Sequence, residues 1–302
     1  MTSSASRKWL IRLGYSAFFS ITFMAALALT FPSDVLKQRL SYELERALGM
    51  PVTVNDVSIG PMGLSSEGIT LLLPSKENKG ARRRLRIDEF RAFPTLSHFI
   101  RGDWGASFSV EALGGHVEGA AAGNPDFLGV RLNEVQLPLQ KLLKALGQDA
   151  LDVTGDISGE ASLDYIPKKT SENTGGGKIT LSKAKIIKGE LFGISLPSLE
   201  IGTLGLEGKL EGNKLQIDKL QAKGGDLDLS VEGNINVNYA SFGRSGLAAK
   251  AKLKITDAFW KKQPDFEGVA KMMLTKYERT DGYYGFSFTG TLKNPKPRTY
   301  KN

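Results

Sequence analysis

The stretch "KLEGNKLQIDKLQAKGGDLDLSVEGNINV", residues 209–237, alternates between apolar and polar residues almost throughout. The apolar positions from residue 215 onward are Leu215, Ile217, Leu220, Ala222, Leu227, Leu229, Val231, Ile235 and Val237. Successive side chains of a β-strand point to opposite faces, so a period of two residues places these positions on one face. The stretch therefore predicts consecutive strands that are apolar on one face and solvated on the other.

The same alternation occupies most of the chain after residue 50. It appears in "VTVNDVSIG" (52–60), where Asn55–Asp56 interrupts the period, and in "LDVTGDISGEASLDYI" (151–166). From residue 178 to 237 we expect strands of about 5 to 7 residues that follow one another with little pause. Few helical segments separate the strands, which favours antiparallel pairing.

The apolar face of such a sheet must be covered, and a closed barrel, a sandwich or a sheet curled around a ligand would each cover it. Periodicity does not choose between them. We predict a mainly β protein: a curved or partly closed antiparallel sheet with a few short helices, preceded by one N-terminal transmembrane helix.

Three segments have helical patterns. Residues 33–48 form an amphipathic pattern with leucine at every fourth position, and Gly49 is suited to end the helix. In "PLQKLLKALG" (138–147), proline stands in the first turn and glycine at the end. A third helix is expected within residues 256–279, interrupted or started near Pro264.

Two further segments have a distinct composition. "PKKTSENTGGGK" (167–178) is typical of an exposed loop, and it is the best candidate for a subdivision of the body. "GYYGFSFTGTLKNPKP" (282–297) predicts a final aromatic strand that leads into a proline-rich tail. Its aromatic residues are expected to pack in the core and at its rim. They are Tyr283, Tyr284, Phe286 and Phe288.

Residues 13–31 contain no charged residue and predict a membrane anchor. As a helix they would span about 28 Å, close to the hydrocarbon thickness of a bilayer. Basic residues precede the run, so residues 1–12 are expected in the cytoplasm and residues 32–302 on the other side. The alternative is a cleaved signal peptide, for which Ala26-Leu27-Ala28 offers a cleavage pattern. The length of the run favours the uncleaved anchor.

Composition excludes several classes of function. The chain has no cysteine, which excludes disulfides, thiolate metal sites and cysteine nucleophiles. Its net charge is +8, and part of this excess flanks the predicted anchor. The body is therefore only mildly basic, and we predict no nucleic-acid partner.

No residue pattern predicts catalysis. The two histidines, His98 and His116, lack metal-ligand spacing and show no convergent partners. The "GGGK" of residues 175–178 resembles a phosphate loop only superficially, because Ile179 stands where serine or threonine is needed. We therefore predict a protein that is not an enzyme, with no catalytic, cofactor-binding or metal-binding residues. An envelope hydrolase is therefore the function class that the sequence supports least.

Three arginines in succession, Arg82 to Arg84, admit two interpretations. They suit lipid phosphate or the acidic face of a partner protein. They equally suit a solvated strand edge that discourages aggregation.

Three passages resemble known families. "ALGMPVTVNDVSIGPMGLSSEGITLLLP" (47–74), behind a single span and a leucine helix, is similar to the N-terminal pattern of AsmA-like proteins. "GISLPSLEIGTLGLEGKLEGNKLQIDKLQAKGGDLDLSVEGNINV" (193–237) and "FSFTGTLKNPKP" (286–297) resemble protein N of the type II secretion system, the GspN family. These are patterns of strands and turns, and no catalytic residues come with them.

The resemblance implies a bacterial inner-membrane, single-pass protein whose main domain is periplasmic. It would be a non-enzymatic component of the type II, or general, secretion pathway. It would act by protein–protein contacts in the export of folded proteins across the outer membrane, with other type II secretion proteins as partners. AsmA-like relatives are linked to lipid movement, so the alternative is a lipid-binding or lipid-transfer protein for envelope maintenance. Phospholipid acyl chains would then lie along an apolar trough of the curled sheet.

Overall fold

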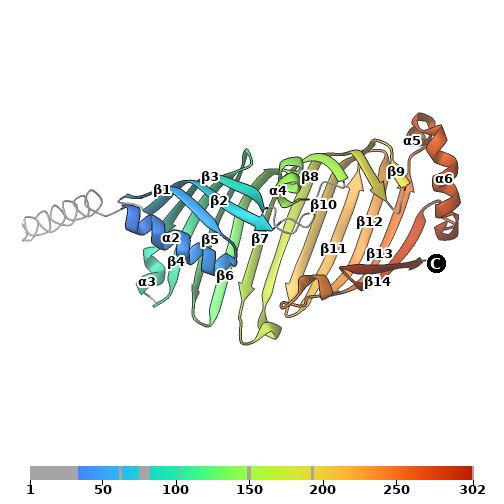
Figure 1. Ribbon diagram of the computed structural model, residues 1–302. Helices are drawn as coiled ribbons and strands as arrows, with labels where there is room; N and C mark the ends of the chain where they lie inside the picture. Colours follow the sequence, from blue (N-terminus) through green and yellow to red (C-terminus); the bar gives the residue numbers. More distant parts are fainter. Residues whose placement is uncertain are drawn as a thin grey trace, which may run out of the picture.

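The computed structural model describes residues 33–60, 63–74, 82–100, 102–147, 151–191 and 194–300. All fifteen described strands belong to one antiparallel sheet, and fourteen of them follow one another in chain order (Figure 1). The remaining strand, β9, pairs with β8. The expected mainly β, antiparallel architecture is confirmed.

The strands are β1 (Val52–Gly60), β2 (Gly63–Pro74), β3 (Arg82–Pro94), β4 (Trp104–Ala112), β5 (Gly115–Asn124), β6 (Phe127–Pro138), β7 (Leu151–Tyr165), β8 (Thr174–Leu191), β9 (Ile194–Leu196), β10 (Leu199–Glu211), β11 (Lys214–Lys223), β12 (Leu227–Asn236), β13 (Gly246–Ile255), β14 (Tyr284–Thr291) and β15 (Asn294–Thr299). The helices are α2 (Ser33–Leu48), α3 (Leu96–Ile100), α4 (Leu139–Leu146), α5 (Asp257–Lys262) and α6 (Pro264–Leu274). Three short 3-10 helices are η1 (Thr170–Glu172), η2 (Phe242–Arg244) and η3 (Thr275–Tyr277).

The sheet is curled and stays open. In Figure 1, β1 to β3 roll over the strands that follow, with α2 beside them, and β14 and β15 lie at the opposite end with α5 and α6. Helix α4 contacts β3 as well as β6 and β7, which supports the roll. Among the described strands, β1 and β15 each have a single neighbour, so the sheet is not closed.

Three sequence expectations about the strands are wrong. The long strands between residues 174 and 236 have 10 to 18 residues, well above the expected length. Residues 175–178, expected as a loop, lie in β8, where they pair with β7 on one side and β10 on the other. Glycine composition suggested a loop, but backbone hydrogen bonds from two neighbours hold these glycines extended. The proline-rich tail is also a strand, β15.

The expected helices are confirmed. Helix α2 has the predicted bounds, and α4 lies between Pro138 and Gly147, whose φ of 76° is the left-handed conformation expected at a helix end. The third segment divides into α5 and α6 at Pro264. The interruption at Asn55–Asp56 is also observed, because burial along β1 shifts by one residue there.

Two clusters of buried side chains lie at opposite ends of the sheet. At one end Val52, Val54, Val57 and Ile69 pack under leucines of α2, and this set is the N-terminal cluster. The leucines are Leu36, Leu40 and Leu44. At the other end Phe259, Trp260 and Ala270 of α5 and α6 form the C-terminal cluster, which packs against Leu199, Ile255 and Phe266.

Within the described ranges, no helix has the length and apolar content needed to cross a bilayer. The predicted anchor at residues 13–31 lies outside those ranges.

Candidate functional site

One row of paired residues crosses the sheet from β1 to β14 and is apolar at nearly every strand. Residues that pair directly across antiparallel strands place their side chains on the same face, so the row defines a face. It reads Val57, Ser66, Phe90, Val110, Val117, Val135, Gly159, Ile179, Leu206, Leu220, Val231, Ala251 and Phe286. Its one hydroxyl, on Ser66, is buried and donates to the Asp56 backbone oxygen at 2.7 Å. We call this the apolar face.

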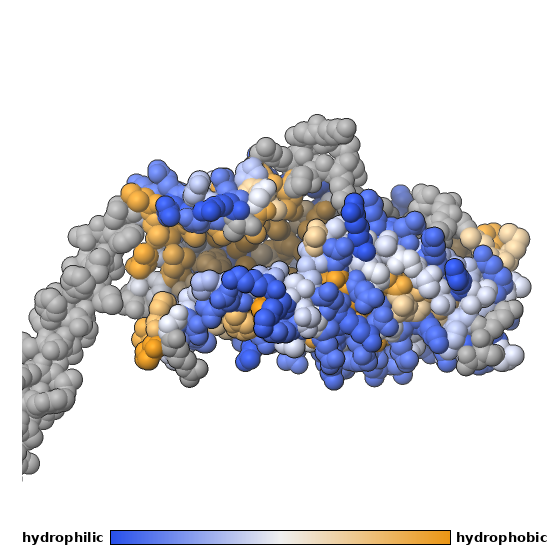
Figure 2. Space-filling model, turned by 90° about the horizontal axis from the view of Figure 1, so that it is seen from below, coloured by the Kyte–Doolittle hydropathy of each residue, from blue (hydrophilic) through white to orange (hydrophobic). Residues whose placement is uncertain are grey.

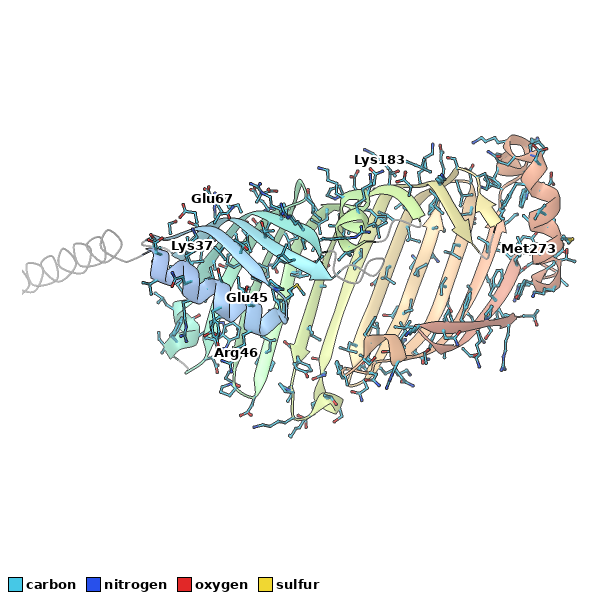
Figure 3. The ribbon with its side chains drawn as sticks, in the orientation of Figure 1. Lys37, Glu45, Arg46, Glu67, Lys183 and Met273 are labelled. Carbon is cyan, nitrogen blue, oxygen red and sulfur yellow. The ribbon has the colours of Figure 1, made fainter. Side chains whose placement is uncertain are left out.

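An adjacent row of paired residues lies on the opposite face and is polar. It reads Glu67, Glu89, Glu111, His116, Gln136, Ser158, Thr180, Gly205, Gln221, Ser230, Lys252 and Gly285. Figure 3 shows Glu67 pointing away from the rolled interior. The two rows establish that one continuous sheet separates an apolar side from a solvated side.

The N-terminal half of the apolar face is hollowed. Seen from below, the N-terminal half contains a hollow whose interior is hydrophobic and whose banks are largely hydrophilic (Figure 2). The hollow lies between the rolled-over β1 to β3 with α2 and the strands that follow. We call the apolar face between the two terminal clusters the trough, lined by the row from Val110 to Ala251.

Protein covers the two ends of the apolar row but leaves its middle open. Val57 belongs to the N-terminal cluster under α2, and Phe90 packs against that cluster. The ring centroids of Tyr277 in η3 and Phe286 lie 4.5 Å apart. Between these ends Ile179 is 41% exposed and Leu163, on the same face, is 36% exposed. Aliphatic side chains in the middle of the row are therefore partly open to solvent.

The pKa of Tyr284 also indicates an apolar environment beside η3, at one end of the trough. Tyr284 pairs with Leu253 on the apolar face, and burial raises the pKa of its phenol. Three of the four aromatic residues noted in the sequence share this face: Tyr284, Phe286 and Phe288. The rings of Phe286 and Phe288 stack with centroids 6.1 Å apart, as packing residues do.

The two histidines of the sequence, the candidates for catalysis or metal binding, are not part of the row that lines the trough. His116 is in the polar row, and its Nε2 lies 3.0 Å from Glu118 Oε1. His98 is on α3, where its ring packs so closely on Gly105 that a Cβ there would lie 2.5 Å from His98 Cδ2. In the part of the chain that the structure describes, no three His, Asp or Glu side chains form a group able to hold a metal ion.

Arg83, at the start of β3, contacts α4 and so supports the roll. Arg83 Nη1 donates to the Lys144 backbone oxygen of α4 at 3.2 Å. Pairing of β3 with β4 begins only at Ile87, so this end of β3 extends beyond β4. The contact links β3 to the connection between β6 and β7, three strands away.

The last strand is a poor site for strand addition. All six residues of β15 are exposed, and Pro295 and Pro297 have no backbone N–H to offer a partner. Lys296 and Arg298 add charge to the same edge. At the opposite edge, α2 packs against β1.

Comparison of the chain with protein-family models, with curated proteins and with solved structures finds no significant match.

Proposed function

We propose that the trough binds the acyl chains of phospholipids, and that the protein is a non-enzymatic lipid-binding or lipid-transfer protein of the cell envelope. The observation that carries the proposal is the uncharged row from Val110 to Ala251, with Ile179 41% exposed at its middle. In this proposal residues 13–31 anchor the chain in the inner membrane, and the sheet lies in the periplasm.

An open aliphatic surface of this extent favours an occupant. Soluble monomers rarely expose contiguous apolar patches larger than about a few hundred Å². Aliphatic side chains without hydrogen-bonding groups suit hydrocarbon, which needs no polar partner. A protein segment laid on the same surface would bring backbone N–H and C=O groups that the row leaves unpaired.

The dimensions suit acyl chains. From β4 to β13 the sheet contains eight strand spacings, which at about 4.8 Å each give roughly 40 Å. The hydrocarbon core of a bilayer is about 30 Å thick, so one acyl chain reaches about 15 Å. Two or three chains would lie end to end along the trough.

A second proposal is the type II secretion component, which the resemblance of residues 193–237 and 286–297 supports. It predicts that partner proteins, and not acyl chains, contact the molecule in the cell. The two edges of the sheet do not favour strand addition, since β15 carries two prolines and α2 packs against β1. The experiment below separates the two proposals.

Photo-crosslinking in cells tests the trough directly. A benzophenone amino acid replaces Ile179 in the full-length protein, and the adducts are identified by mass spectrometry after irradiation. We expect phospholipid adducts, because Ile179 lies on the open floor of the trough. Thr180, the next residue in β8, lies in the polar row and is the matched control. The same amino acid at Thr180 is expected to give no lipid adduct.

Two outcomes would contradict lipid binding. Protein adducts at Ile179 without lipid would favour the secretion component. Equal lipid adducts at both positions would show that the label reports the nearby membrane and not the trough. Resistance of each variant to limited proteolysis confirms that the sheet has folded.

A further inference from the structure

Large apolar side chains stand unprotected at one end of the molecule. In α3, Leu96 is 74% exposed and Ile100 is 88% exposed, and Phe99 beside them is also exposed. Trp104, which begins β4, is exposed as well. A five-residue helix that buries none of its own residues is not held by a core. We call these four residues the apolar tip.

The apolar tip lies at the end of the molecule where α2 begins. Figure 1 places α3 beneath the start of α2, and Figure 2 shows the hollow opening at the same end. Val35, in the first turn of α2, adds a further exposed apolar side chain. Two segments about sixty residues apart in the chain therefore present apolar surface at the same end.

The chain leaves little distance between this end and the predicted anchor. Only Pro32 lies between residues 13–31 and Ser33, where the described chain begins. Extended chain spans at most about 3.5 Å per residue, so Ser33 would lie within about 10 Å of the end of the span. The start of α2 is thus expected at the membrane surface, and the apolar tip with it.

The chemistry of the tip suits the boundary of a bilayer. Tryptophan is enriched at membrane interfaces, where its ring is apolar and its N–H stays near the headgroups. Leucine, isoleucine and phenylalanine favour the hydrocarbon beneath. Lys37, one turn into α2 at this end (Figure 3), has a long apolar stem and a charged head that fit the same boundary.

We infer that Leu96, Phe99, Ile100 and Trp104 insert into the leaflet that faces the sheet, and seat the open end of the trough on the membrane that holds the predicted anchor. The occupant of this surface is a lipid bilayer. The inference goes beyond acyl-chain binding because it assigns a membrane contact to a surface outside the trough. It does not rest on the trough being filled.

The absence of cysteine makes the insertion measurable in the full-length protein. A single Ile100→Cys variant is labelled with a nitroxide and reconstituted in vesicles of phosphatidylethanolamine and phosphatidylglycerol. Spin relaxation by oxygen, which concentrates in hydrocarbon, is compared with relaxation by a water-soluble nickel chelate. We expect relaxation by oxygen to be stronger than relaxation by the nickel chelate for the label at position 100.

Met272→Cys is the matched control. Met272 is 75% exposed on α6, at the opposite end of the sheet, and Figure 3 shows the adjacent Met273 pointing away from the strands. We expect relaxation by the nickel chelate to be stronger than relaxation by oxygen for the label at position 272. A label at Ile100 that is open to nickel would overturn the inference. A label shielded from both reagents would overturn it in favour of a partner protein or a second copy.

Equal depths of the two spin labels in the bilayer, at positions 100 and 272, would also overturn the inference, because the sheet would then lie flat on the membrane. The outcomes are separate from those of the crosslinking experiment. Insertion at Ile100 without lipid adducts at Ile179 would keep the membrane contact and reject the acyl-chain trough. The reverse pair of results would keep the trough and reject the membrane contact.

Discussion

Gly205 and Gly208 lie three residues apart in β10, on opposite faces of the sheet. A Cβ on Gly208, on the apolar face, would lie 2.7 Å from the Gln216 backbone oxygen, whereas a Cβ on Gly205 would meet nothing within 4 Å. A concave face brings neighbouring backbones toward its own side chains, so the inner glycine permits the curl and the outer one does not affect it. Alternation predicts the face on which each of these residues lies. It does not predict which position needs a missing side chain, because that depends on the approach of a neighbouring strand.

We expect Gly208→Ala to lower the free energy of unfolding by about 1–3 kcal/mol, the range for overpacking. Gly205→Ala is expected to leave it unchanged or raise it by up to about 1 kcal/mol, since alanine restricts the unfolded chain. Urea unfolding followed by circular dichroism measures both. Equal destabilisation by the two substitutions would contradict the role given to curvature.

At the scale of elements, the sequence predicted three helical segments better than the strand bounds, but it did not predict the short helix α3. Caps and breakers such as Pro138, Gly147 and Pro264 act locally, and their helices ended where expected. Strand bounds depend on neighbours, so residues 175–178 became part of β8 against the tendency of their composition. The proline-rich tail became an edge strand because β14 supplies a partner for it.

The segment that leads into β14 contains a charge pair that should make stability depend on pH. The hydrogen bond from Arg279, with its positive charge, holds the pKa of Asp281 below its usual value. Arg279 Nη1 also donates to the Tyr300 backbone oxygen at 3.4 Å. A carboxylate whose pKa falls on folding stabilises the fold above its unfolded pKa. That contribution is lost as the pH falls through the lower, folded pKa.

We therefore expect Asp281→Asn to lower the thermal midpoint slightly at neutral pH, and the difference from the parent protein to shrink as the pH falls below the ordinary aspartate pKa. Thermal unfolding across that range measures it. Glu278→Gln, which removes a nearby carboxylate that has no ion pair with Arg279 among the described contacts, is the control. A difference that persists unchanged in acid would show that the aspartate acts by shape and not by charge.

For the whole molecule, alternation predicted one apolar face but could not predict that its middle stays open. Leu206 and Ile179 would alternate in the same way in a sandwich, where a second sheet covers them, or in a closed structure. Coverage of the apolar face depends on how many helices and further strands pack on it. Among the described elements, α2 packs at one end of the face, and α5 and α6 pack at the other.

One continuous row also predicts that lipids occupy the trough in series. If they enter at the end with the apolar tip, Leu206→Glu at the middle should reduce lipid crosslinking at Val231, beyond it, and leave crosslinking at Val117 unchanged. A buried charge in hydrocarbon opposes passage. Gly205→Glu, on the polar face beside it, is the control. Unchanged crosslinking at both positions would indicate that lipids enter through the open side.

The strand order has a consequence for how the chain acquires its shape. Each long strand pairs with its immediate predecessor, so nearly every contact that builds the sheet joins segments close in sequence. Low contact order favours rapid folding, which is unusual for an all-β chain of this length. If the polypeptide passes through a translocation pore from its amino end, each strand that emerges can pair with the strand that emerged before it. Assembly then proceeds by successive addition, and no early strand has to wait for a distant one.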